Sequence, residues 1–401
     1  MELELKIESV EAFLLIAAVV ALLARRLRLP YTVGLLLAGI AVAFTPWNPH
    51  LEVTKELVFA LFLPPLVFEA AFALHWDELK RDMAPLLGMA TLGVVLSTAV
   101  VFLGFTGLLG WDWRAALMFS TLISATDPVG VIAMLKEARV TGRFRLLIEA
   151  ESLFNDGTAA AIFAVALVAV GTGIGTGEAL FTFAKIAVGG LACGGAVGAF
   201  AIWLMGRTDD HLVEITCTVL AAYGAFLLAE HFGFSGVLGT VVAGLMVGNI
   251  GPLGALTAKG RDDAETFWEF CAFVVNSLIF LLMGLRIAET NYLPIAGVAG
   301  AAVLLVTLGR AVAVYGVMAL FFRSKHRLDV RSQHLLVWGG MRGALALALA
   351  LGLPKSLPMH DEVLAVTFAV VAFSTVVQGI TMVPLIARHK TLTESPADST
   401  P

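Results

Sequence analysis

Charged side chains are scarce in this chain. Asp, Glu, Lys and Arg together make up 14% of its 401 residues, whereas a soluble domain has roughly 25%. Cysteine is scarcer still, with three residues, Cys193, Cys217 and Cys271. They lie far apart in apolar stretches and form no Cys-x-x-Cys or Cys/His spacing. These shortages argue against a soluble globular domain, a disulfide framework and a structural metal site. No cofactor and no nucleic-acid partner are expected.

Long hydrophobic runs take the place of the missing charge. Hydrophobic residues account for 59% of the chain. A membrane-spanning helix needs about 20 consecutive apolar residues, and the runs are continuous rather than alternating, which is typical of membrane helices rather than of a membrane β-barrel. We therefore expect an all-α polytopic membrane protein surrounded by lipid.

Thirteen transmembrane helices fit the sequence. The first is expected to be retained rather than cleaved as a signal peptide, because its positive charges follow the apolar run instead of preceding it. The expected spans are residues 11–24, 31–45, 56–73, 83–106, 114–135, 146–170, 179–205, 211–231, 235–249, 266–288, 293–322, 333–352 and 361–387.

Lys and Arg are distributed unequally between alternate loops. Eighteen fall in loops that these spans place on one side of the membrane, and five fall in segments on the other side. Because cytoplasmic loops of membrane proteins are enriched in Lys and Arg, the side with eighteen is expected to be the cytoplasm. The sequence therefore predicts an N-terminus outside the cell and a cytoplasmic C-terminus.

The number of spans permits an inverted repeat. Spans 1–6 and 8–13 form two six-helix halves, and an offset of seven spans gives them opposite orientation, as in many secondary transporters. Spans 5 and 12 then correspond, and both are interrupted: span 5 by Thr126-Asp127-Pro128 and span 12 by Gly339-Gly340-Met341-Arg342-Gly343. Irregular backbone at membrane depth persists only where it lines protein or a wet cavity. Broken spans at corresponding positions of the two halves predict a transport site.

The sixth span carries a costly group of polar side chains, Glu151-Ser152-Leu153-Phe154-Asn155-Asp156. An Asp at the centre of a membrane helix costs about 2.5–3.5 kcal/mol on insertion scales. Ser152 and Asp156 are i,i+4 neighbours, and so are Glu151 and Asn155, so one helix face presents hydroxyl, carboxylate and amide oxygens. Hard cations prefer oxygen ligands. The pattern predicts a site for a cation or a proton, with a purely structural polar network as the alternative.

The break in span 5 leaves two roles open for its polar residues. Asp127 either joins the polar face of span 6 or caps the half-helix that begins at Pro128. Thr126 is either a ligand or a hydroxyl bonded to the backbone. Carbonyl groups one turn earlier, near Ser124 and Ala125, lose their helical partners because proline has no N–H.

Two buried arginines require counter-charges. By depth in the membrane, Arg310 of span 11 is expected to pair with Glu151. Arg342 of span 12 is expected to pair with Glu69 of span 3. We interpret all four as supports of the site rather than as ligands.

Two buried carboxylates on adjacent spans suggest exchange. Neighbouring carboxylates repel and burial disfavours their charged forms, so a cation and a proton compete to neutralise the site and each displaces the other. An intramembrane aspartyl protease also needs two Asp residues, but no Gly-x-Gly-Asp occurs and the buried arginines have no role there. A cation channel would conduct without coupling to protons.

Five motifs give the chain a family resemblance over residues 10–390. With these motifs it resembles the monovalent cation:proton antiporter family of the NhaP/NHE type. The motifs are Pro64-Pro65-Leu66-Val67-Phe68-Glu69, Thr126-Asp127-Pro128-Val129, Glu151-Ser152-Leu153-Phe154-Asn155-Asp156-Gly157, Gly309-Arg310 and Arg342-Gly343-Ala344.

The resemblance implies how the chain is divided. Residues 1–401 would form one sodium/hydrogen exchanger transmembrane domain in the inner membrane of a prokaryote. A six-helix core would comprise 83–170 and 293–387, a dimerisation domain that makes a homodimer would comprise 11–73 and 179–288, and 388–401 would be a short cytoplasmic tail.

The resemblance also implies residue roles. Asp156, Asp127, Ser152 and the main-chain carbonyl of Thr126 would contact Na⁺ or Li⁺, with K⁺ as the alternative cation. Glu151 would be held close by, paired with Arg310. The broken spans 5 and 12 would cross at mid-membrane, and Asn155 would steady this crossing. The Asn155-Asp156 pair is similar to the electroneutral branch of the family, whereas the electrogenic branch has two Asp residues there.

Overall fold

The structure is a computed structural model, and its described part is helical throughout, with no β-strand among those residues. Residues 389–401 of the predicted tail are not among the described residues, and Pro128 is not among them either. The described residues are 2–27, 29–46, 57–127, 129–137, 140, 142–173 and 175–388.

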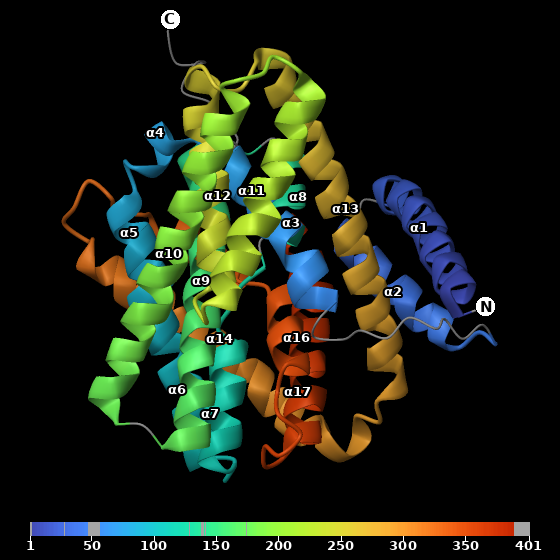
Figure 1. Cartoon of the computed structure of the whole chain (residues 1–401). Coiled ribbons are helices and arrows are strands. Elements are labelled where there is room, and N and C mark those ends of the chain that lie inside the picture. Colours follow the sequence, from blue (N-terminus) through green and yellow to red (C-terminus); the bar gives the residue numbers. More distant parts are fainter. Residues whose placement is uncertain are drawn as a thin grey trace, which may run out of the picture.

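The helices pack side by side along one direction (Figure 1). A π-helical turn over Leu57–Phe62 leads into α3, and two others join α5 to α6 and α17 to α18. The helices are α1 (Glu2–Leu27), α2 (Tyr31–Ala43), α3 (Leu63–Ala73), α4 (Trp76–Leu79), α5 (Met83–Gly88), α6 (Val94–Gly107), α7 (Trp113–Leu122), α8 (Val129–Glu137), α9 (Arg143–Thr172), α10 (Thr176–Met205), α11 (His211–His231), α12 (Gly236–Ile250), α13 (Ala258–Glu289), α14 (Ala296–Leu320), α15 (Val330–Trp338), α16 (Ala344–Leu351), α17 (His360–Phe373) and α18 (Gly379–Ala387).

Seven helical stretches in the described residues are long and apolar enough to cross a membrane. The all-α membrane class is therefore confirmed, whereas the count of thirteen spans and the inverted repeat stay predictions. The seven stretches are Met83–Gly107, Arg143–Thr172, Thr176–Met205, His211–His231, Ala258–Glu289, Leu293–Leu320 and His360–Ile386.

Short polar side chains begin several of these helices. Each accepts a hydrogen bond from a backbone N–H of the first turn, which has no partner within its own helix. Aspartate, serine and threonine at these points therefore set where the helices start. The capping residues are Asp112 of α7, Asp210 of α11, Ser235 of α12, Thr257 of α13 and Asp329 of α15.

Glycine allows α2 and α13 to lie in direct backbone contact. A Cβ at Gly39 of α2 would lie 2.2 Å from the Leu281 carbonyl oxygen, and one at Gly284 of α13 would lie 2.3 Å from the Leu36 carbonyl oxygen. Helix α13 also packs against α3. Figure 1 shows α1, α2 and α13 together on one side of the molecule. Helices α2, α3 and α13 form one wall of the cavity described below.

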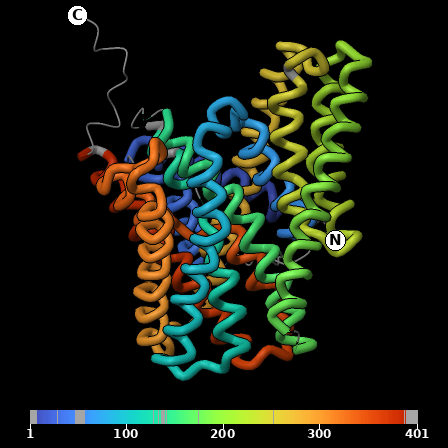
Figure 2. The backbone as a smooth tube through the Cα atoms, turned by 90° about the vertical axis from the view of Figure 1, so that its left-hand side faces the viewer, coloured from blue at the N-terminus to red at the C-terminus, as the bar shows by residue number. Residues whose placement is uncertain are grey.

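The other helices form two further groups. Helices α10, α11 and α12 pack on one another, and α6 packs against α14. In the side view of Figure 2, the green and yellow helices of the first group stand apart from the cyan and orange helices of the second.

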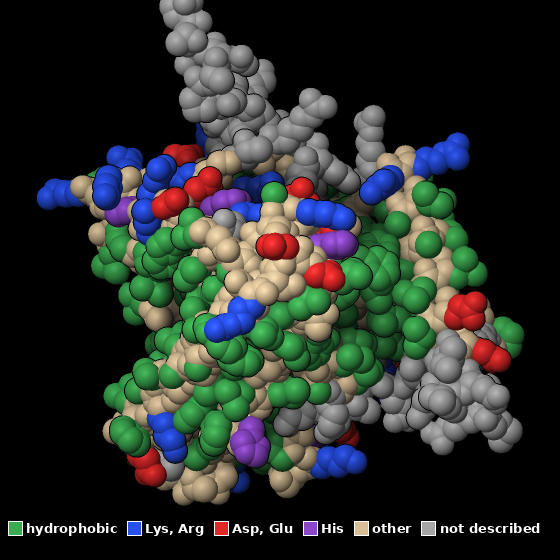
Figure 3. All heavy atoms as spheres, turned by 45° about the horizontal axis from the view of Figure 1, so that its top comes forward, with side chains coloured by type: hydrophobic (Ala, Val, Ile, Leu, Met, Phe, Trp, Pro, Cys, Tyr) green, Lys and Arg blue, Asp and Glu red, His purple; other side chains and the backbone are tan. Residues whose placement is uncertain are grey.

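Apolar side chains cover much of the outer surface. Leu22 of α1, Phe181 of α10 and Leu304 of α14 are all strongly exposed, as expected for helices whose solvent is lipid. Figure 3 shows hydrophobic side chains spread over the flank, and Lys and Arg side chains gathered toward the upper end of the view. This distribution fits a protein that spans a membrane.

Candidate ion-binding site at the helix breaks

Two interruptions of helical backbone meet inside the protein. Helix α7 ends at Leu122 and α8 begins at Val129, whereas α15 ends at Trp338 and α16 begins at Ala344. The two non-helical segments touch, because the Asp127 backbone N–H donates to the Met341 carbonyl oxygen at 2.7 Å. Four helix ends are thus brought to one place.

The Asp127 carboxylate contacts two of these ends. Its Oδ1 accepts from the Val129 backbone N–H at 3.0 Å, and its Oδ2 accepts from the Ala344 backbone N–H at 3.4 Å. Helix N-termini carry partial positive charge and favour a carboxylate. The capping role that the sequence left open is therefore present, for α8 and α16 together.

Gly343 makes the contact with α16 possible. A Cβ at this position would lie 1.7 Å from Asp127 Oδ2, closer than any real Cβ contact. Only glycine therefore lets the start of α16 lie directly against the carboxylate.

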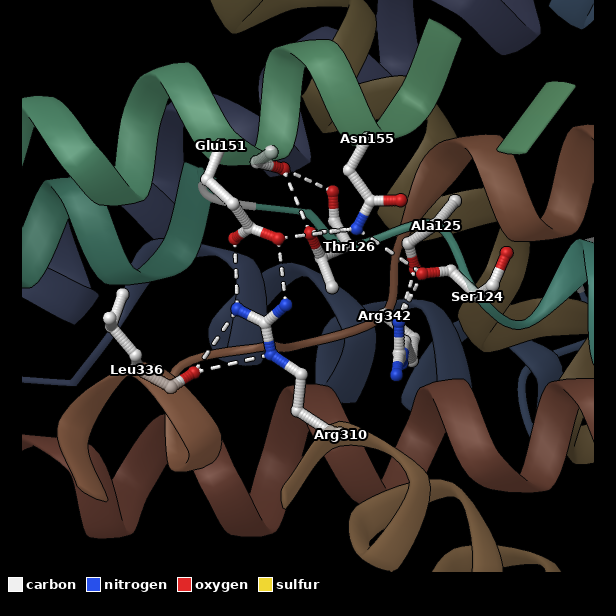
Figure 4. Close-up of polar contacts among 9 residues, drawn as sticks. Ser124, Ala125, Thr126, Glu151, Asn155, Arg310, Leu336 and Arg342 are labelled. Atoms are coloured by element: carbon white, nitrogen blue, oxygen red, sulfur yellow. Dashed lines mark hydrogen bonds and ion pairs between the residues drawn. The ribbon is translucent and has the colours of Figure 1, made fainter. Parts of the chain in front are cut away.

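Arg342 contacts the opposite kind of helix end. Its Nη1 donates to the carbonyl oxygens of Ser124 at 2.7 Å and of Ala125 at 2.8 Å, just beyond α7 (Figure 4). Its backbone N–H donates to Ser374 Oγ at 2.7 Å. The predicted pairing of Arg342 with Glu69 is therefore wrong. The guanidinium instead satisfies carbonyl groups that the break leaves without helical partners, where partial negative charge gathers.

Arg310 and Glu151 form the ion pair that the sequence predicted. Arg310 Nη1 lies 2.7 Å from Glu151 Oε1, and Nη2 lies 2.8 Å from Oε2 (Figure 4). Arg310 also donates to the Leu336 carbonyl oxygen, from Nε at 3.3 Å and from Nη2 at 3.2 Å. Both charged side chains are buried, so each needs the other.

Asn155 and Ser152 fasten α9 to the break after α7. Asn155 Nδ2 donates to the Ser124 carbonyl oxygen at 3.3 Å and to Thr126 Oγ1 at 3.1 Å. The Ser152 hydroxyl donates to the Thr126 carbonyl oxygen, and Thr126 Oγ1 lies 3.3 Å from Ser152 Oγ. The predicted ligand atoms of Thr126 and Ser152 are thus hydrogen-bonded to each other.

Asp156 faces a cavity of about 350 Å³. Its Oδ1 is shielded from solvent and has no hydrogen-bond partner among the described residues. Asp127, Thr126 and Glu69 line the same cavity, whereas Ser152 and Glu151 line a much smaller hollow beside Thr126 and Arg310. The cavity therefore collects four of the predicted site residues, and the ion pair lies behind it.

The walls of this cavity come from two groups of helices. Helices α2, α3 and α13 supply one wall, and α8, α9, α16 and the break after α7 supply the other. Among the described lining residues, five are acidic and none is Lys, Arg or His. The cavity surface thus favours cations over anions.

Asn276 of α13 also lines the cavity. It is not among the site residues that the sequence predicts. The available signal was a single amide side chain within the apolar run of span 10. A lone polar residue inside a membrane helix faces the protein interior or a cavity in most cases.

The donor atoms at the site are oxygens. In the described residues, no group of three or more His, Cys, Asp and Glu side chains is arranged to hold a metal ion. Carboxylate, hydroxyl and carbonyl oxygens are instead the ligands that hard cations prefer. The arrangement therefore offers oxygen ligands to a hard cation.

Known proteins resemble the chain over most of its length. Residues 14–388 match the family described as "Sodium/hydrogen exchanger, transmembrane". The Na⁺/H⁺ antiporter ApNhaP of Aphanothece halophytica is 35% identical over 367 residues, covering 90% of this chain and 70% of that protein. The Na⁺/H⁺ antiporter NhaH of Halobacillus dabanensis is 33% identical over 389 residues, covering 94% and 96%.

A solved structure has the same fold. The sodium proton antiporter MjNhaP1 from Methanocaldococcus jannaschii at pH 8 matches with a TM-score of 0.75 at 18% identity, covering 98% of this chain and 99% of that one. The family match spans both helix breaks and the carboxylates between them. The chain belongs to the sodium/hydrogen exchanger family.

Proposed function

We propose that the chain is an electroneutral antiporter that exchanges Na⁺ or Li⁺ for H⁺ by alternating access. It is a secondary transporter and not an enzyme, as its family membership indicates. Its relatives are named Na⁺/H⁺ antiporters. One observation carries the proposal: Asp156, whose Oδ1 has no hydrogen-bond partner among the described residues, lines a cavity that Asp127 also lines.

The formal charges of the site support exchange of one ion for another. Asp127, Glu151 and Asp156 contribute three negative charges, and Arg310 and Arg342 contribute two positive charges. When all five are ionised, a single negative charge remains. One monovalent cation or one proton neutralises it, and a neutral site crosses the membrane interior at far lower cost than a charged one.

The site residues divide into ligands and supports. Asp156 and Asp127 are proposed to bind the ion, with Ser152 and Thr126 exchanging their mutual hydrogen bond for contacts to it.

The supports hold the break in place. The ion pair of Glu151 with Arg310 joins α9 to α14, Asn155 ties α9 to the break after α7, and Arg342 completes the backbone bonding of that break. Glu69 is proposed to face the ion from α3, since it lines the cavity opposite α9.

The proposed architecture has thirteen spans in two inverted six-helix halves. Residues 83–170 and 293–387 would form the moving core, and 11–73 and 179–288 the dimerisation domain of a homodimer. The cavity supports this division, because its two walls come from these two parts. The N-terminus would lie outside and the C-terminus in the cytoplasm of a prokaryote, by the distribution of Lys and Arg.

K⁺ is the alternative cation. The ligand types at the site are the same for all alkali cations, so Na⁺, Li⁺ and K⁺ differ only in the ligand distances that each requires.

Proteoliposomes with an enclosed pH-sensitive dye test the function. With the purified protein and an imposed pH gradient, addition of Na⁺ or Li⁺ is expected to move protons, and K⁺ to move few. A potential imposed with valinomycin is expected to leave the rate unchanged, because one charge moves each way. Proton movement equal to that of protein-free vesicles with all three cations would contradict antiport, and a rate that follows the potential would contradict electroneutrality.

A further inference from the structure

Asn276 lines the same cavity as Asp156, but on a different helix. It lies in the apolar part of α13, is 6% exposed, and lines the cavity together with Asp156 and Asp127. Helix α13 belongs to the wall made with α2 and α3, whereas Asp156 belongs to α9. The two polar side chains thus face the same space from different groups of helices.

The amide of Asn276 has an oxygen without a partner. Its Oδ1 is shielded from solvent and accepts no hydrogen bond from any described residue, which is unfavourable for a buried carbonyl. The adjacent Ser277 is different: its Oγ donates to the Phe273 carbonyl oxygen and lies 2.5 Å from the Tyr31 hydroxyl oxygen. A structural role explains Ser277, whereas the hydrogen bonds of the described residues give Asn276 no such role.

An amide suits a cation that retains part of its water. Its oxygen is a neutral ligand for a hard cation, and its N–H groups donate to water or to a carboxylate. A half-turn about the Cβ–Cγ bond exchanges the positions of Oδ1 and Nδ2. The side chain does not titrate, so it distinguishes a metal cation from a proton, which a carboxylate does not.

We propose that Asn276 is an additional cation ligand, which contacts the incoming Na⁺ or Li⁺ in the cavity before and while the ion binds Asp156. The inference rests on the proposed antiport function. It places a binding contribution on α13, in the wall that faces the carboxylates. Because the amide binds the cation and not the proton, Asn276 sets the affinity for the metal ion alone.

Exchange kinetics of the Asn276→Ala variant in proteoliposomes test this proposal. The apparent KM for Na⁺ is expected to rise about threefold to tenfold, the effect of one lost ligand-type contact, with Vmax kept within about twofold. The rise is expected to be the same factor at pH 7 and at pH 8.5, since proton binding is unaffected. Thr266→Ala, at an exposed position of the same helix, is the control and should leave KM unchanged.

Two further variants separate binding from folding. Asn276→Ser keeps an oxygen ligand and is expected to restore most of the affinity for Na⁺. Asn276→Leu fills the space without an oxygen and should raise KM as alanine does. If the alanine variant does not fold, the difference in KM between the serine and leucine variants decides the question.

Failure of this inference differs from failure of the proposed function. An unchanged KM in Asn276→Ala, or a lower Vmax with the wild-type KM, would overturn the role of Asn276 while the wild-type protein still exchanges ions. Absence of exchange by the wild-type protein would instead overturn the function on which the inference rests.

Discussion

Arg310 of α14 and Glu151 of α9 form a bidentate ion pair inside the membrane region, with nitrogen–oxygen distances of 2.7 and 2.8 Å. The same guanidinium holds the Leu336 carbonyl oxygen near the end of α15. One pair thus joins three helices directly behind the carboxylates that face the cavity. We interpret it as a brace, since neither side chain lines the large cavity.

Removal of one partner from this pair should destabilise the protein strongly. In Glu151→Ala, Arg310 becomes an uncompensated buried charge, and the expected loss is about 3–5 kcal/mol. Thermal unfolding in detergent measures it. The double variant Glu151→Leu with Arg310→Met should recover much of the stability, because both charges are then gone. A single variant as stable as the wild type would contradict the brace.

A methyl group at Gly343 should disturb Asp127. The Gly343→Ala variant places Cβ where Asp127 Oδ2 now lies, so the carboxylate must move away from the Ala344 N–H. We expect the exchange rate to fall on the order of a hundredfold, as for an ångström-scale displacement of a reacting group. Gly297→Ala on α14 is the control, because nothing lies within 4 Å of its added Cβ. Equal rates in the two variants would argue against a role for the Asp127 position.

Loss of the Asn155 amide should loosen the attachment of α9 to the break. Asn155→Ala leaves the Ser124 carbonyl oxygen and Thr126 Oγ1 without this donor, at an expected cost of about 1–3 kcal/mol. Thermal unfolding and transport should both be impaired. Thr158→Ala is a matched change on the same helix, because that hydroxyl donates only to the Phe154 carbonyl oxygen within its own helix. A loss in Thr158→Ala as large as in Asn155→Ala would point to a general effect on α9.

A second polar cluster, before α5, gives a prediction for low pH. Arg143 Nε and Nη2 each lie 2.8 Å from an Asp82 carboxylate oxygen, and His326 Nδ1 lies 3.1 Å from Oδ1. Burial raises the pKa of the Asp82 carboxyl, but the hydrogen bonds and positive charges of Arg143 and His326 lower it more, so the net pKa is below the usual value for Asp.

The sign of the pH effect follows from this shift. A depressed pKa stabilises the folded state above the unfolded value, near 3.9, and this stability is lost as the pH falls through the folded value. Between about pH 5 and 3, the wild type should therefore lose more thermal stability than Asp82→Asn. An equal fall in melting temperature for the two proteins over that pH range would refute the contribution of Asp82.

The sequence identified most of the site but not all of its contacts. Polar residues in an apolar run are conspicuous, so Glu151 and its partner Arg310 could be paired by depth. The pairing of Arg342 with Glu69 by depth considers only ionised side chains as counter-charges, whereas a helix end also carries partial charge. The Ser124 carbonyl oxygen was expected to lack a partner, yet only the folded chain shows that Arg342 supplies it.

Cavity walls are harder to predict than motifs. Asn276 is far from the other site residues in sequence and lies on α13, in no motif with them. Its position depends on the packing of α13 against α2, where glycines let the backbones touch. That packing places Asn276 in the lining of the cavity that Asp156 also lines, and nothing in the pattern of span 10 alone specifies it.

Exchange by the Asp156→Asn variant in proteoliposomes, measured beside the wild type with the same pH dye and Na⁺ addition, is the decisive comparison. The substitution keeps the size of the side chain and removes the carboxylate that is proposed to bind cation and proton in turn. We predict a folded protein, with a wild-type elution profile in size-exclusion chromatography, that moves no more protons than protein-free vesicles. Sodium-dependent proton movement at the wild-type rate would show that Asp156 is not the exchanging group.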